Sequence, residues 1–251
     1  FNSINLNNSY SSIFENVVMD GAGFSIYNSG NVSIEDCIIT NSLIGISLEN
    51  SDGARIINNT IDQFTLKGIN IVDVYYIEAI KDNIIKSTIN TSEIYGIFAS
   101  YPDIFYPFMG YADLNYSLIS NNHIEITNSL SGGNIYGMYN IRNGIIDANT
   151  LILNNTNMNS NGYGITFDRG QVSNNNITID FDDYEDAAIF SLLCEDVAYE
   201  KRSIIENNII NIDYRSSGIY LGPCLDQDSD IIASNNTIFT YNSQSEDQYG
   251  I

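Results

Sequence analysis

The stretch Ile56-Ile57-Asn58-Asn59-Thr60-Ile61 joins an apolar pair to a polar turn and then to a second apolar position. The same phrase returns near the other end of the chain as Ile232-Ala233-Ser234-Asn235-Asn236-Thr237-Ile238, and looser copies lie between and before them. Each copy is followed by a second marker, a small residue and then an apolar one, as in Gly45-Ile46 and Gly68-Ile69. Because the two markers keep this order along the chain, the sequence is a tandem repeat.

An asparagine or aspartate two residues before the second apolar position marks each repeat. The markers are Asn16, Asp36, Asn59, Asn83, Asn122, Asn149, Asn175, Asn208 and Asn236. Short β-branched runs with period two, such as Ile177-Thr178-Ile179-Asp180, lie between turn-forming clusters. No segment keeps apolar residues three and four apart for long enough to favour an amphipathic helix. The pattern predicts an all-β chain in which each repeat forms one coil of a parallel β-helix.

The asparagine marker has a physical reason in this fold. A sharp turn between two strands needs a residue that tolerates positive φ, and asparagine does so at little cost. Equivalent residues of adjacent coils lie about 4.8 Å apart, so we expect the markers to stack and hydrogen-bond as an asparagine ladder. The small residue of the Gly-Ile marker should permit a tight entry into the next strand. Nine coils at this spacing predict a rod roughly 43 Å long.

The Asn-Asn-x-Ile and Gly-Ile motifs resemble those of the right-handed parallel β-helix superfamily, which includes pectate lyases, polygalacturonases, phage tailspikes and secreted surface proteins. The resemblance covers nearly the whole chain and implies a single-stranded right-handed solenoid. It places the ladder at the turn between the second and third sheets, and any substrate in a groove beside the first sheet. We expect one domain over residues 1–251, forming part of a longer protein.

The charge balance restricts the partners. The chain has 31 acidic and 9 basic residues, a formal net charge of −22. This excludes a main role in binding nucleic acid, which requires clustered lysine and arginine, and it disfavours docking on anionic lipid. No apolar run approaches the roughly 20 residues that span a bilayer, so we expect no membrane insertion. Solubility, cation binding and basic partners agree with the charge.

Two repeats are longer than the others, which predicts side-loop insertions at about residues 99–117 and 191–202. The first insertion is aromatic and carries Pro102 and Pro107. Its candidate ligand-binding residues are Tyr101, Phe105, Tyr106, Phe108, Tyr111 and Tyr116. Exposed aromatic side chains stack on sugar rings and anchor protein contacts, whereas a loop packed on the side of the rod is the alternative. The second insertion is expected to be a solvated excursion.

The cysteines predict a covalent link. Cys194 and Cys224 each follow the apolar residue of a second marker, Ile189 or Ile219, by five positions. Equal offsets in stacked coils place two residues above one another within reach of a disulfide. We therefore predict a Cys194–Cys224 bridge and an oxidising compartment, with two stacked thiols as the alternative. Cys37 is expected to be a lone thiol.

One acidic stretch, Asp226-Gln227-Asp228-Ser229-Asp230, has the alternating acids of a calcium loop. Ile231 stands where an EF-hand needs glycine, which favours a solvated turn. The candidate metal ligands are Asp226, Asp228 and Asp230. We expect that the chain requires no cofactor and that calcium is the ion that it could bind.

No residue set in the sequence predicts catalysis. The carboxylate patterns of polygalacturonases do not occur together, and Arg142 and Asp168 are expected to form a surface ion pair on the first sheet. We expect a non-enzymatic, extracellular structural or adhesive rod of a cell-surface protein, which binds glycans or surface proteins through its aromatic loop. A polysaccharide lyase or glycoside hydrolase acting in a lateral groove is the alternative. A filament subunit that associates end to end is a second alternative.

Overall fold

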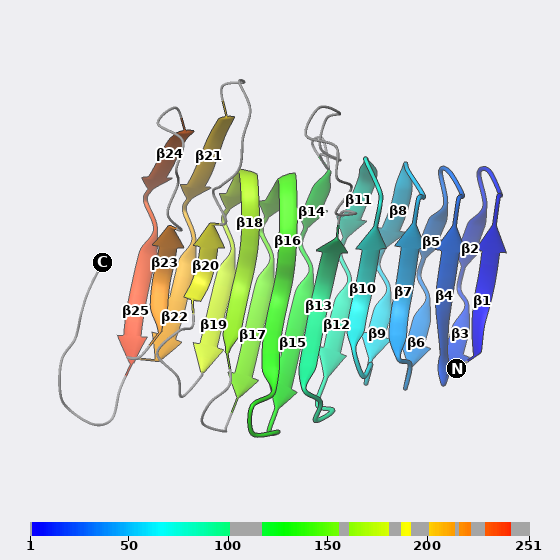
Figure 1. The fold of residues 1–251 in the computed structure, drawn as a ribbon, viewed down its shortest axis with the longest axis horizontal. Coiled ribbons are helices and arrows are strands. Elements are labelled where there is room, and N and C mark those ends of the chain that lie inside the picture. The colour runs from blue at the N-terminus through cyan, green and yellow to red at the C-terminus, as the bar shows by residue number, and fades with distance from the viewer. Residues whose placement is uncertain are drawn as a thin grey trace.

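The computed structural model describes residues 2–100, 117–155, 161–180, 187–191, 201–213, 216–221 and 229–241. All regular structure in these ranges is β-strand, and the chain winds into a rod whose coils follow one another from the N-terminal to the C-terminal end (Figure 1). The coils contribute strands to three faces, and the strands that pair within a face are parallel. The parallel β-helix predicted from the repeat is therefore confirmed.

The strands are named here by face. Face 1 consists of β1 (Asn2–Asn7), β4 (Ala22–Tyr27), β7 (Ile44–Glu49), β10 (Lys67–Val72), β13 (Glu93–Ser100), the first parts of β16 (Asn134–Asp147) and β18 (Gly162–Ser173), β20 (Ala187–Ser191) and β23 (Ser217–Leu221). Face 2 consists of β2 (Ile13–Glu15), β5 (Ser33–Glu35), β8 (Ala54–Ile57), β11 (Ile77–Lys81), β14 (Leu118–Ser120), the second parts of β16 and β18, β21 (Lys201–Glu206) and β24 (Ser229–Ser234). Face 3 consists of β3 (Val18–Asp20), β6 (Ile38–Thr40), β9 (Thr60–Asp62), β12 (Ile84–Ser87), β15 (His123–Asn128), β17 (Thr150–Asn155), β19 (Asn176–Asp180), β22 (Ile209–Asp213) and β25 (Thr237–Tyr241).

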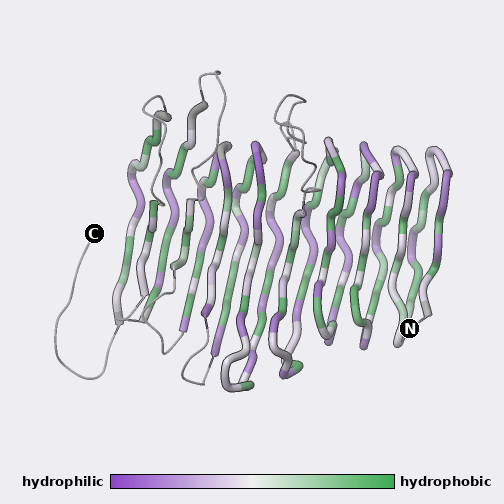
Figure 2. Tube along the Cα trace, in the orientation of Figure 1, coloured by the Kyte–Doolittle hydropathy of each residue, from purple (hydrophilic) through white to green (hydrophobic). Residues whose placement is uncertain are grey.

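Apolar side chains from the three faces fill the interior of the rod in rows. Hydrophobic and hydrophilic residues alternate along many of the strands (Figure 2), so one side of a strand points inward and the other faces solvent. The buried row of face 3 contains Ile39, Ile61, Ile85, Ile124, Leu151, Ile177 and Ile210. Burying one such side chain contributes about 1.5–3 kcal/mol. The repeated apolar positions of the sequence therefore form one continuous core.

The turn between faces 2 and 3 is built by a residue with positive φ in each coil. These residues are Asn16, Asp36, Asn58, Asp82, Asn121, Ala148, Asn174, Asn207 and Asn235, with φ between 53° and 58°. Asparagine and aspartate adopt this left-handed conformation more readily than most residues do, which explains why they fill eight of the nine sites. The sequence analysis assigned positive φ to the marker asparagine itself. The structure places it one residue earlier in the coils from Asn59 onward.

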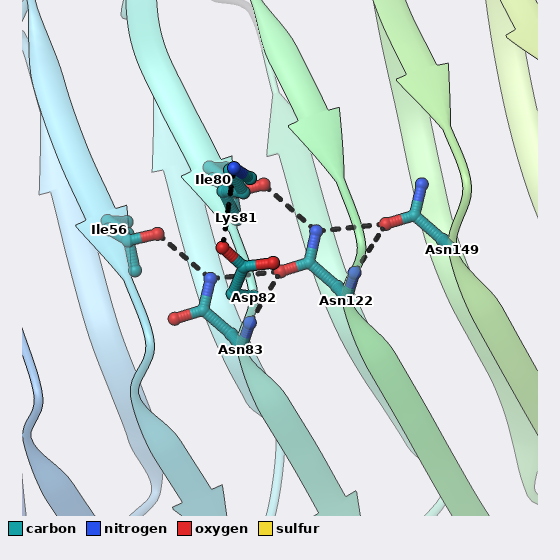
Figure 3. Close-up of polar contacts among 7 residues, drawn as sticks. All are labelled: Ile56, Ile80, Lys81, Asp82, Asn83, Asn122 and Asn149. Carbon is teal, nitrogen blue, oxygen red and sulfur yellow. Dashed lines mark hydrogen bonds and ion pairs between the residues drawn. The ribbon is translucent and has the colours of Figure 1, made fainter.

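The residue after this turn points into the rod and carries the hydrogen-bonded asparagines. Asn122 is 1% exposed, and its Nδ2 donates both to Ile80 O and to Asn149 Oδ1 at 2.9 Å (Figure 3). Its backbone N–H donates to the same Asn149 oxygen, while its own Oδ1 accepts from Asn83 in the preceding coil. The same bonds link Asn59, Asn83, Asn122, Asn149, Asn175, Asn208 and Asn236. From Asn59 onward, each coil is thus joined to the next by buried side-chain amides.

The first two markers are corrected by the structure. Asn16 and Asp36 occupy the positive-φ site, and the register of face 3 places Val17 and Cys37 at the position that Asn59 holds in the following coil. Cys37 N–H still donates to Asn59 Oδ1 at 3.0 Å, but the buried thiol offers no strong acceptor to the coil before it. Its Sγ lies 3.7 Å from Phe14 O, where an asparagine amide would bond. The hydrogen-bonded asparagines therefore begin at Asn59.

Replacing Cys37 by asparagine is expected to stabilise the protein by about 1 kcal/mol. The new amide can donate to Phe14 O and to Asn59 Oδ1, and its oxygen can accept from Val17 N–H, as the other asparagines do in their coils. Urea unfolding of Cys37→Asn and Cys37→Ala would measure the effect, because the alanine variant removes the thiol without adding an amide. An asparagine variant no more stable than the alanine variant would contradict the prediction.

Candidate functional site

Seven aromatic side chains lie on the outer side of face 1 and are called the aromatic band. They are Tyr95 and Phe98 on β13, Tyr136 and Tyr139 on β16, Tyr163 on β18, Phe190 on β20 and Tyr220 on β23. The second marker of the repeat explains their placement. Gly96 and Ile97 are both buried in the rod, and the residues on either side of this pair, Tyr95 and Phe98, lie on the outer side, where neighbouring rings leave Tyr95 only 8% exposed.

The rings of the aromatic band stack from coil to coil. The Tyr95 and Tyr136 ring centroids are 4.6 Å apart with an interplanar angle of 10°. Phe98 stacks on Tyr139 at 5.7 Å and 9°, and Phe190 stacks on Tyr220 at 5.0 Å and 8°. Tyr95 and Tyr136 form one row of rings, and Phe98 and Tyr139 form a second row beside it. The two rows contact each other edge to face, as between Tyr136 and Tyr139 at 4.9 Å and 67°. Both geometries are those that the ring quadrupole favours, and each pair contributes about 0.5–1.5 kcal/mol beyond its burial.

A lysine covers the N-terminal end of the aromatic band. Lys67 on β10 is the register partner of Tyr95, and its Nζ lies 3.4 Å from the centroid of the Phe98 ring. The same Nζ donates to Asn70 Oδ1 at 2.8 Å, and Asn70 donates to Ser47 Oγ in the preceding coil. Burial lowers the pKa of Lys67, and the nearby Glu93 carboxylate acts in the opposite direction. The band therefore begins at a fixed cation held over a ring face.

Tyr95 and Tyr136 of the aromatic band have a raised pKa. Burial, followed by the charge of Glu93, raises the pKa of Tyr136 to about 12, and it raises the pKa of Tyr95 further. Tyr95 also donates its hydroxyl to Glu93 Oε2 at 3.1 Å. At neutral pH the Tyr95 and Tyr136 phenols therefore act as hydrogen-bond donors and acceptors and carry no charge.

An ion pair joins β16 and β18 further along these strands, beyond the aromatic band. Arg142 on β16 and Asp168 on β18 are register partners, and Arg142 Nε lies 3.5 Å from Asp168 Oδ2. The sequence correctly placed these residues side by side, but it predicted a surface pair. Asp168 is only 4% exposed, so the prediction is wrong for the carboxylate. The Arg142 side chain is 28% exposed and lies beside this buried carboxylate, so Arg142 is a candidate polar group for a ligand next to face 1.

The comparison with known families agrees with the parallel β-helix fold. Residues 1–103 match the family model described as “Right handed beta helix region”. The described residues beyond the match continue the same three parallel faces, so a right-handed parallel β-helix is the fold of the described part of the chain. No curated protein and no solved structure matches the chain.

Several predicted sites of the β-helix lie outside the residues that the structure describes. They are the aromatic-loop residues Tyr101, Phe105, Tyr106, Phe108, Tyr111 and Tyr116, the two cysteines Cys194 and Cys224, and the acidic residues Asp226 and Asp228. Of the predicted calcium ligands, only the backbone of Asp230 is described, in β24 opposite Arg202. Within the described ranges no group of three histidine, cysteine, aspartate or glutamate residues could hold a metal ion. These ranges also contain no helix able to cross a membrane.

The described ends of the two insertions belong to the β-helix itself. Ala99 and Ser100 are the last residues of β13, Ser191 ends β20, and Lys201 begins β21. Cys37 is a free, buried cysteine, as predicted. Burial raises the pKa of its thiol, which disfavours the reactive thiolate.

Sequence analysis missed the aromatic band, although the sequence contains a signal for it. Tyrosine stands directly before the glycine of the second marker in Tyr95-Gly96, Tyr136-Gly137 and Tyr163-Gly164. Because this glycine points inward, a repeated Tyr-Gly pair predicts a row of outward tyrosines on one face.

Proposed function

We propose that the chain is a non-enzymatic, extracellular rod of a cell-surface protein that binds a glycan along the aromatic band. The supporting observation is the continuity of the band. Its members follow one another through four coil steps, from Tyr95 to Tyr220, which corresponds to about 19 Å along the axis. A glycan chain of alternating apolar and hydroxyl surfaces matches a strip of this length and composition.

The ring stacking decides how such a glycan would lie. Stacked rings cover one another's faces, so the half-buried members of the band offer ring edges more than ring faces to a ligand. Tyr220, 44% exposed at the C-terminal end of the band, is the member that keeps the most surface for a sugar ring. A sugar stacked on Tyr220 and hydroxyl bonds to the half-buried Tyr139 and Tyr163 would align the glycan with the rod axis.

Glycan binding is expected to weaken about five- to tenfold when Tyr139 and Tyr220 are replaced together by alanine. The loss corresponds to about 1–1.4 kcal/mol, the size of one to two aromatic contacts. Affinity electrophoresis in gels containing neutral and acidic polysaccharides would measure it. Phe239→Ala is the matched control, since Phe239 is 54% exposed on β25 of face 3, away from the band. Equal binding by both variants, or no binding by the wild-type protein, would contradict the proposal.

A polysaccharide lyase or hydrolase is the second candidate, favoured by the ion pair of Arg142 and Asp168. A guanidinium held by a buried carboxylate next to a substrate strip could stabilise negative charge in a cleavage reaction. Incubation with a polysaccharide panel, with calcium or with a chelator, would decide between the candidates. Cleavage that disappears in Arg142→Ala and persists in Arg55→Ala would support an enzyme, whereas binding without cleavage supports the rod.

A further inference from the structure

Exposed tyrosines and acids gather at the turn between faces 1 and 2 in the first four coils. We call this surface the tyrosine–acid patch, and it consists of Tyr10, Tyr27, Glu49, Asp52, Tyr75 and Tyr76. The four tyrosines are 79%, 40%, 58% and 42% exposed in chain order. Four exposed aromatic side chains at one turn form an apolar surface patch, and such patches mark interaction sites. The patch lies on other coils than the aromatic band.

The register of the coils brings these residues together. Tyr10 pairs with Gly30 in the next coil, and a Cβ on this glycine would lie 3.0 Å from the Tyr10 ring. Tyr27 and Glu49 are register partners on β4 and β7. Asp52 of the third coil is hydrogen-bonded to the fourth coil. Its Oδ1 accepts from Tyr75 N–H at 2.6 Å and from Tyr76 N–H at 3.2 Å. Consecutive coils are about 4.8 Å apart, so the patch is one continuous strip.

The charge around the tyrosine–acid patch is mainly negative. Residues 1–54 contain six acidic residues and no lysine, arginine or histidine. The first basic residue, Arg55, is engaged on face 2 by Glu35 at 3.4 Å and by Glu78 at 3.3 Å. The other basic residues of the third and fourth coils are also engaged, because Lys67 lies over the Phe98 ring, Lys81 pairs with Asp82 and Lys86 pairs with Glu125. Such a surface attracts cations and repels acidic partners.

We propose that the tyrosine–acid patch docks a lysine- or arginine-rich segment of a partner protein. The chemistry is complementary in two ways, because tyrosine faces attract ammonium and guanidinium groups and carboxylates accept their hydrogen bonds. A neutral glycan would use the tyrosines and would leave the excess negative charge without a role. The strip geometry suits an extended peptide, whose successive side chains can meet successive coils.

Titration of a fluorescein-labelled lysine–glycine peptide, followed by anisotropy at low salt, tests the proposal. Tyr27→Ser and Tyr75→Ser leave the net charge unchanged, and each should weaken binding about two- to fivefold, the value of one exposed cation–π contact. Phe239→Ser is the control for loss of an exposed ring elsewhere. A serine–glycine peptide should not bind.

A second pair of variants separates local contact from the general field of an acidic protein. Glu49→Gln and Glu206→Gln remove the same charge, but Glu206 lies on β21, far along the rod from the tyrosine–acid patch. The Glu49 variant should weaken peptide binding more than the Glu206 variant. If the tyrosine variants bind like the wild type, or if paired variants lose affinity equally, the attraction is non-specific and the proposal is wrong. Circular dichroism of each variant would check that the fold is kept.

Discussion

Replacing Asn122 by alanine is expected to lower the free energy of unfolding by about 3–5 kcal/mol. The Asn122 amide accepts two hydrogen bonds from Asn83 and donates to Ile80 O and Asn149 Oδ1 (Figure 3). Alanine would leave the buried Asn83 donors and Ile80 O unsatisfied in the centre of the rod. Each buried polar group without a partner costs about 1–3 kcal/mol, and a half-satisfied network loses more than the sum of its pairs suggests.

Urea unfolding followed by circular dichroism would measure the effect of Asn122→Ala. His123→Ala is the matched control, because His123 is the next residue, half-exposed, and its side chain faces Glu125 on the outer side of face 3. This control should change stability by no more than about 0.5 kcal/mol. Amide exchange supplies a second readout, since the Asn83 N–H loses its acceptor only in the alanine variant at Asn122. A loss below about 1 kcal/mol would show that the amides are not a stabilising network.

The coil architecture could be predicted from sequence because equivalent positions of every coil require the same kind of residue. An inward residue such as Ile61 must be apolar, and the turn before it must tolerate positive φ. The position of the ladder could be predicted where the second turn residue is asparagine, as at Asn58-Asn59 and Ala148-Asn149. In Asn16-Val17 and Asp36-Cys37 one polar residue remains, and either turn site would accept it. Only the strand register shows that it occupies the first site.

The aromatic band required information that spacing along the chain does not contain. Tyr95 and Tyr136 are register partners although they are 41 positions apart, because an insertion follows β13. Phe190 stacks on Tyr220 after an interval of 30 positions. A row on the rod surface exists only after every coil has been aligned, and irregular coil lengths hide that alignment in the sequence. Outward positions are also free to vary, so the repeat places no requirement on them.

The glycine of the second marker is required by the distance between coils. A Cβ built on Gly137 would lie 2.5 Å from Gly164 O in the next coil and 2.6 Å from Leu151 Cδ2 on face 3. Both distances are far below van der Waals contact, and the first involves backbone. Gly137 does not have positive φ, in contrast to Gly21, so its role is to leave space. The sequence analysis expected a tight entry into the strand, and the structure identifies the neighbouring coil as the obstacle.

Gly137→Ala is therefore expected to destabilise the protein by about 2–4 kcal/mol, because the coil must move away from its neighbour to admit one methyl group. Thermal and urea unfolding would measure the loss. Ala188 is buried at the equivalent position of a later coil, so Ala188→Gly is the control and should cost about 1 kcal/mol or less. The displacement should also disturb the Tyr136 and Tyr139 rings on either side of the Gly137-Met138 pair, and near-ultraviolet circular dichroism would detect it. Unchanged stability and an unchanged tyrosine signal would mean that the coil spacing does not select glycine. The expected result would show that the inward Gly137 is required both for the spacing between coils and for the arrangement of the aromatic rings on the surface.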